Sequence, residues 1–201
     1  MSVTINSLRV SRVIKWGAIP AALVLSGLTI AGASYSAFSA TTTNPTSNWA
    51  AGSVSLADDD SSAALFTATN LKPGSTGTKC IVVSSTGSLP SIVKLYGTGA
   101  TTTNALSSSI NLSVVQGTGG SFGSCTGFTA LSSGSSIYSG TLAAFATGST
   151  GYSNGLGNWA PTGTATETRT YQITYTVDAA APNTTQGGTA AIGFTWETQN
   201  S

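Results

Sequence analysis

The segment TRTYQITYTVD, residues 168–178, alternates apolar and polar side chains along almost its whole length. In an extended strand, this alternation places the apolar residues on one face and the polar residues on the other. The apolar face carries Tyr171, Ile173, Tyr175 and Val177. A second segment, TAAIGFTWET at residues 189–198, places Ile192, Phe194 and Trp196 together in the same way. Two strands that each hide one face favour a layered β structure.

Shorter alternating runs, separated by Gly, Pro and Asn turns, precede these two strands. We predict strands at 52–60, 63–70, 78–85, 91–97 and 108–117, of which the run at 91–97 is short and edge-like. Residues 136–148 are expected to hold a strand and a single helical turn, and 117–128 and 150–163 are expected to be loops. No stretch of ten or more residues after residue 38 has helical periodicity. About eight strands with one apolar face each predict an all-β domain at 50–201, a jelly-roll-like β-sandwich that follows an N-terminal signal helix.

The first 37 residues have the layout of a secretory signal peptide. Three basic residues (Arg9, Arg12 and Lys15) precede an apolar stretch from Trp16 to Ala31, and small residues follow it. The alternative is a retained membrane anchor, because no charged residue occurs between Lys15 and Asp58. We predict cleavage and a secreted, cell-surface-associated protein that meets the membrane only before processing.

The charged residues exclude several classes of function. After residue 38 the chain has four Lys or Arg residues against six Asp or Glu residues, so it lacks the basic patch of a nucleic-acid-binding protein. The chain has no His, which removes Ser-His-Asp and Cys-His catalysis and the HExxH zinc site. Many serines lie near the few lysines, but no Ser stands out as a nucleophile. We predict no catalytic residue and no cofactor.

The two cysteines, Cys80 and Cys125, form an even pair. In an exported protein such a pair predicts a disulfide, which here would pin the Gly-rich loop at 117–128 to the strand that carries Cys80. The alternative, a metal site, would need further ligands, and the chain has no His.

Few other residues are candidates for a site. Asp58, Asp59 and Asp60 are weak candidates for Ca²⁺ ligands, but they lack the spacing of an EF-hand loop, and a solvated turn is the favoured interpretation. Glu167, Asp178 and Glu197 are the remaining carboxylates, and we do not expect a glycosidase pair among them. Trp49 and Trp159 are expected to pack over the ends of the sandwich, with a glycan-binding platform as the alternative.

Several stretches together resemble the camelysin/TasA family of exported surface and biofilm-matrix proteins. The junction AGASYSAFSATTTNPTSNWAAGSVSLADDD is similar to the start of family members. The block NLKPGSTGTKCIVVSSTGSL is similar to the family's NLKPGD, strand and NxGSL pattern, with Ser75 where Asp is frequent. The ending QGGTAAIGFTWETQN is similar to the closing strand of the family. The matching motif residues are Asn70, Leu71, Lys72, Pro73, Gly74, Gly87, Ser88 and Leu89.

The motif residues also have a physical interpretation. Pro73 fixes φ and Gly74 can take a positive φ, so the two predict a type II turn that delivers the Cys80 strand into the sheet. We expect Gly87 to do the same at the next corner. The motif therefore marks a fold rather than an active site.

The resemblance implies a jelly-roll fold and cleavage by a SipW-type signal peptidase after Ala37, which leaves Phe38 as the new N-terminus. It also implies self-assembly into fibres, in which residues 38–49 of one subunit add as a donor strand to the next, with Phe38, Thr41 and Thr43 in that strand. An unpaired tail is the alternative. The Cys pair and the hydroxyl-rich composition resemble the actinobacterial branch. Some family members are described as zinc metalloproteases, an activity that we do not carry over to a chain without His.

We therefore predict an exported structural protein of the cell surface or extracellular matrix. Its expected partners are the signal peptidase, further copies of itself and other matrix or surface components, with no nucleic acid. The alternatives are a monomeric surface adhesion module that uses Trp49, Trp159 or the Gly-rich loop, and a camelysin-like metallopeptidase.

Overall fold

The computed structural model describes residues 51–200. The predicted signal peptide, the Ala37–Phe38 cleavage site and the donor segment with Phe38, Thr41, Thr43 and Trp49 lie outside the described residues. Within the described range, no helix is both long enough and apolar enough to cross a membrane.

The larger of two antiparallel sheets has six strands. Its order is β1 (Leu56–Asp58), β2 (Thr76–Ser85), β8 (Glu167–Val177), β4 (Ile110–Thr118) and β5 (Thr129–Ala130), and β6 (Ser136–Thr141) also pairs with β4. The two long central ladders are in continuous register. Ile81 lies opposite Tyr171 on one side of β8, and Val114 lies opposite Ile173 on the other.

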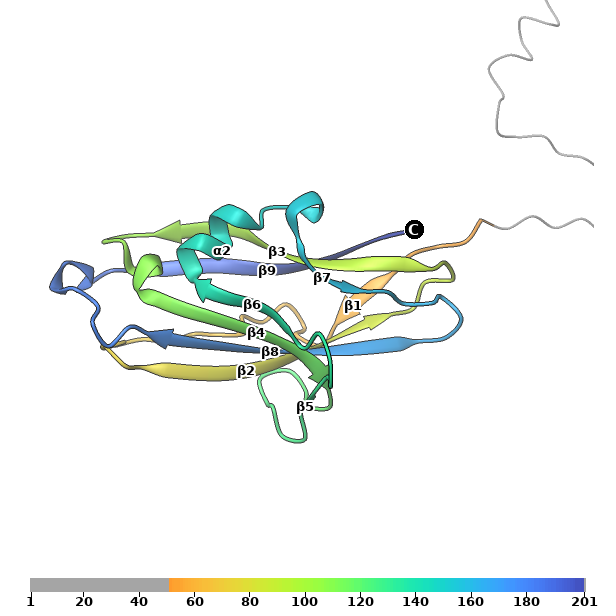
Figure 1. Ribbon diagram of the computed structural model, residues 1–201, viewed down its shortest axis with the longest axis horizontal. Helices are drawn as coiled ribbons and strands as arrows, with labels where there is room; N and C mark the ends of the chain where they lie inside the picture. The colour runs from red at the N-terminus through yellow and green to blue at the C-terminus, as the bar shows by residue number, and fades with distance from the viewer. Residues whose placement is uncertain (1–50, 201) are drawn as a thin grey trace, which may run out of the picture. The chain divides into compact units, whose positions relative to one another are not determined.

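The smaller sheet has three antiparallel strands in the order β7 (Leu156–Trp159), β3 (Ser91–Thr102) and β9 (Ala190–Asn200). Figure 1 shows the two sheets as stacked layers, and the chain crosses between them at the β2–β3, β3–β4, β6–β7, β7–β8 and β8–β9 connections. This arrangement confirms the predicted all-β sandwich, with nine strands within residues 51–200 rather than about eight.

The apolar residues of the alternating runs form the core between the two sheets. Ile81 and Val83 of β2, Val93 and Leu95 of β3, and Ile173 of β8 are all at most 3% exposed.

A short helix closes part of the sandwich. Helix α2 (Leu142–Gly148) is capped by Thr141, whose hydroxyl accepts a hydrogen bond from the Ala144 N–H, and it buries Phe145 fully. Three single 3₁₀ turns lie at Leu106–Ser109, Tyr152–Asn154 and Asn183–Thr185.

Three details of the prediction were wrong. The run at 63–70 forms no strand and instead crosses the side of the sandwich as an irregular segment. The run at 91–97 is not an edge strand but the start of twelve-residue β3, the central strand of the smaller sheet. The predicted loop at 150–163 contains β7, and residues 136–148 form the predicted strand followed by a seven-residue helix, longer than the single turn expected.

Candidate functional site

The Asn70–Gly74 motif forms the turn that leads into β2. Gly74 has φ of 81°, and the Ser75 N–H donates to the Lys72 carbonyl at 2.9 Å, as in a type II turn with Pro73 at its second position. The Gly74 N–H then donates to the Val177 carbonyl at 3.0 Å. The turn therefore fixes the start of β2 against the end of β8, as the sequence indicated.

Gly87, at the second motif corner, works differently from the prediction. It has no positive φ, but a Cβ atom there would lie 2.7 Å from the Ser53 carbonyl oxygen and 2.8 Å from the Val54 Cα. The glycine is required because another stretch of backbone passes against it, not because of its own conformation.

That passing backbone is the segment before β1. The Ser88 and Leu89 N–H groups both donate to the Ser53 carbonyl, at 2.7 and 3.2 Å, and the Ser53 N–H donates to the Ser88 Oγ at 2.9 Å. Gly52 packs against Leu89 so closely that a Cβ atom would overlap its side chain. The AGSVSL and GSL stretches of the sequence are thus two halves of one contact, which holds the chain where it enters the domain.

The predicted disulfide is present. Cys80 and Cys125 are joined, and the loop that carries Cys125 lies on the outer face of the larger sheet, because Cys80 points away from the core residues Ile81 and Val83. The Gly123 N–H donates to the Cys80 carbonyl at 2.9 Å, so the loop is held by a backbone bond as well.

The aspartate run supplies a structural clamp. The two carboxylate oxygens of Asp59 accept from the Val82 N–H at 2.8 Å and from the Phe122 N–H at 2.7 Å. Asp59 therefore ties the end of β1 both to β2 and to the disulfide loop. Asp60 accepts from the Ser62 N–H. Burial, and after it a side-chain hydrogen bond with Asp60, raise the pKa of Asp58. Among residues 51–200, no three His, Cys, Asp or Glu side chains converge as a metal site.

The other carboxylates each have local partners. The Thr162 hydroxyl and N–H donate to Glu167 and lower its pKa. The Gln199 amide and the Tyr96 hydroxyl donate to Glu197 and lower its pKa. Asp178 accepts from the Ala180 N–H after β8 ends. These bonds stabilise turns and strand ends.

Trp159 packs inside the sandwich. It lies in β7 opposite Val93, is 5% exposed, and has the Arg169 guanidinium 5.6 Å from its ring centroid. It is therefore not available as the glycan platform that the sequence left open.

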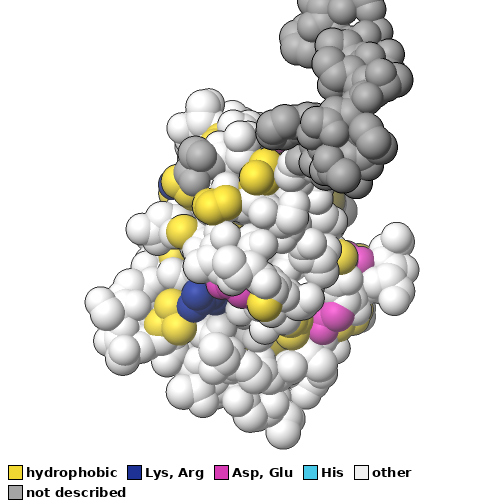
Figure 2. Space-filling view, turned by 90° about the vertical axis from the view of Figure 1, so that its right-hand side faces the viewer, with side chains coloured by type: hydrophobic (Ala, Val, Ile, Leu, Met, Phe, Trp, Pro, Cys, Tyr) yellow, Lys and Arg dark blue, Asp and Glu magenta, His cyan; other side chains and the backbone are white. Residues whose placement is uncertain are grey.

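The exposed face of the larger sheet carries uncharged hydroxyl groups in register. Thr76 pairs with Thr176 through hydroxyls 3.0 Å apart, and Thr78 with Thr174 at 2.9 Å. Figure 2 shows another side of the molecule, on which Lys, Arg, Asp and Glu side chains are few and scattered.

The β9 strand provides an unusually long edge. Its eleven residues pair only with β3, so among the described residues its other side has no strand partner. The other strands at the sheet margins are shorter where they lack a partner, such as three-residue β1 and four-residue β7. Proteins usually protect such edges with short strands, proline or several charges. The only charged residue of β9 is Glu197, and β9 has no proline.

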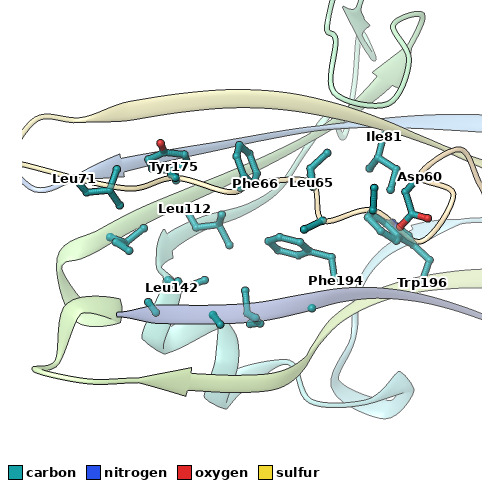
Figure 3. A pocket seen from close by; sticks show the side chains of 18 residues that line it. Asp60, Leu65, Phe66, Leu71, Ile81, Leu112, Leu142, Tyr175, Phe194 and Trp196 are labelled. Carbon is teal, nitrogen blue, oxygen red and sulfur yellow. The ribbon is translucent and has the colours of Figure 1, made fainter. Parts of the chain in front are cut away.

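An apolar groove of about 440 Å³ lies beside this edge, between the two sheets. Phe194 and Trp196 of β9 form one wall, and Ile81, Leu112 and Tyr175 of the larger sheet form the other. Residues 60–71, here called the strap, run along the groove. Figure 3 shows Asp60 at one end of the strap, Leu71 at the other, and Leu65 and Phe66 between them.

The groove and the strap are the features that the sequence did not reveal. Leu65, Phe66 and Leu71 carry the apolar signal, but the alternation of this run predicts a strand. Only the position of the strap opposite β9 identifies it as the cover of a groove.

Comparison of the sequence with models of known protein families and with curated proteins finds no match.

Proposed function

We propose that this protein is a secreted structural subunit that assembles into extracellular fibres. In this proposal, residues 38–49 of one copy add as a strand to the β9 edge of the next. The observation that carries it is the eleven-residue edge of β9 beside an apolar groove. Strand addition uses main-chain hydrogen bonds for affinity and pockets for alternate side chains.

The donor segment FSATTTNPTSNW suits this role in length and composition. Its twelve residues would span about 40 Å when extended, and β9 about 36 Å, at roughly 3.3 Å per residue. It is uncharged, is rich in β-branched Thr and has Phe38 and Trp49 as apolar ends. Pro45 would have to lie at a bulge or at the end of the pairing.

The position of residues 51–53, where the described chain begins, favours pairing of the donor segment with another copy over pairing with its own β9. The described chain starts and ends at the same end of the sandwich (Figure 1), and the contact between Ser53 and the Gly87–Leu89 corner holds the start there. To lie along its own β9, the donor segment would have to reverse immediately before that contact. We therefore propose that the donor segment pairs with another subunit instead.

The disulfide supports the location. A bond between Cys80 and Cys125 fits an oxidising compartment such as the outside of the cell. The proposal therefore includes export with the first 37 residues as signal peptide, and cleavage before Phe38.

The test uses protein secreted by the native host and imaged by negative-stain electron microscopy. Deleting residues 38–49 should abolish fibres while the thermal unfolding midpoint of the domain stays within a few degrees of wild type. Thr43→Pro should also abolish fibres because proline cannot donate to the ladder, whereas Thr43→Val, its matched control, should retain them. Fibres from the deletion variant would contradict the proposal.

A further inference from the structure

The strap is attached firmly at its two ends. At one end, the Asp59 carboxylate bonds to β2 and to the disulfide loop at 2.8 and 2.7 Å. At the other, the type II turn bonds to the end of β8 through the Gly74 N–H. Both attachments lie outside the stretch that covers the groove.

Between these ends the strap is held by side chains alone. From Ala64 to Leu71, no backbone hydrogen bond joins the strap to either sheet among the described residues. Its attachment consists of half-buried Leu65, Phe66 and Leu71, with Phe66 packed edge-on against Tyr175 at 5.2 Å between centroids. The covered groove thus keeps its apolar contacts, but the β9 edge stays unpaired.

The backbone of the strap is also strained near its first end. Ser61 and Ser62 have φ of 51° and 66°. Residues other than glycine and asparagine adopt these left-handed conformations at an energetic cost. A strap released from the groove would be free to leave them.

A donor strand would pair with the β9 edge, which the strap does not do. It would make main-chain bonds to β9, and its end residues Phe38 and Trp49 are the large apolar side chains that it could supply to the groove. Because only side chains hold its middle, the strap can leave the groove without disturbing Asp59 or the Pro73–Gly74 turn.

We propose that the strap is a removable cover of the acceptor groove, which the donor segment of the next subunit displaces during assembly. This inference rests on the proposed function. Only subunits with an uncovered groove accept a donor, so stronger contacts between the strap and the groove should slow fibre growth.

The first test combines hydroxyl-radical footprinting and hydrogen–deuterium exchange by mass spectrometry on the processed full chain, as monomer and as fibre. The half-buried side chains of Leu65, Phe66 and Leu71 should be oxidised faster in the fibre than in the monomer because they leave the groove, and the amides of 190–200 should exchange more slowly. If fibres form but these side chains become more protected or stay unchanged, the strap remains in place and the inference is wrong.

The second test is kinetic. Phe66→Ala should shorten the lag of fibre growth severalfold because it weakens the cover. Val114→Ala, a fully buried core variant away from the strap, is the control for destabilisation and should not shorten the lag. Equal or longer lags for Phe66→Ala would overturn the inference and leave strand addition standing, whereas a complete absence of wild-type fibres would overturn both.

Discussion

The two motif glycines should respond differently to the same substitutions. Gly74 has φ of 81° and open space around its missing side chain, whereas Gly87 has no positive φ and has backbone atoms at 2.7 and 2.8 Å from where a Cβ would be. At Gly74 the backbone conformation disfavours other residues, whereas at Gly87 the lack of space for a side chain does. We therefore predict that asparagine is tolerated better than alanine at Gly74 but not at Gly87.

At Gly74, alanine should cost about 1 kcal/mol of unfolding free energy. The left-handed conformation costs an L-residue about 1–2 kcal/mol, and reduced freedom of the unfolded chain returns about 0.4–1 kcal/mol. Gly74→Asn should cost less, because asparagine tolerates this region better than alanine.

At Gly87, alanine should cost about 1–3 kcal/mol, the usual range for an overpacked site, because the Cβ would push the Ser53–Val54 backbone away. Gly87→Asn should be no better than Gly87→Ala, since it adds bulk where no space exists. Urea unfolding monitored by tryptophan fluorescence measures all four variants, and equal denaturant slopes would validate the comparison. A neutral Gly87→Ala, or a clear gain from Gly87→Asn over Gly87→Ala, would refute the argument.

Two further predictions concern stability. Replacing both Cys80 and Cys125 by alanine should cost about 4 kcal/mol by loop-closure entropy, since the bond spans 45 positions. At roughly 2–4 °C per kcal/mol, calorimetry should show a midpoint about 8–16 °C lower, and an unchanged midpoint would contradict the structural role of the bond. Burial raises the pKa of the Tyr171 phenol, so the folded state keeps its proton where the unfolded state loses it. The contribution of Tyr171 to the free energy of unfolding is therefore fully present below its pKa in the unfolded state, near 10, and decreases as pH rises above that value. Tyr171→Phe should flatten that alkaline decline in pH-dependent urea unfolding, and an identical decline in the variant would contradict the assignment.

The sandwich could be predicted from the sequence because alternation of apolar and polar residues is a local signal, and the apolar face of each strand is the face that becomes buried. Tyr171 and Ile173 lie inward in β8 as their spacing indicated, and the Pro73–Gly74 turn has the conformation that its residue types favour. Features that depend on contacts between distant segments could not be predicted from the sequence. The close approach of Ser53 to Gly87 and the strap over the groove are such features.

The strap shows the limit most clearly. Leu65 and Phe66 occur in a run that alternates like a strand, but alternation cannot tell whether a neighbouring strand offers a ladder. In the folded domain this segment lies between two sheet edges and bonds to neither along Ala64–Leu71, so the same apolar residues serve as a cover.

The most direct measurement is a photo-cross-link from the donor segment in assembled fibres. A photoreactive amino acid at position 43 would be incorporated into processed protein, and fibres would be grown from a mixture of ¹⁴N- and ¹⁵N-labelled subunits. Strand addition to β9 predicts cross-links between position 43 and residues 190–200 that join peptides of different isotopic label. Cross-links confined to peptides of one label, or to another face of the domain, would contradict strand addition to β9.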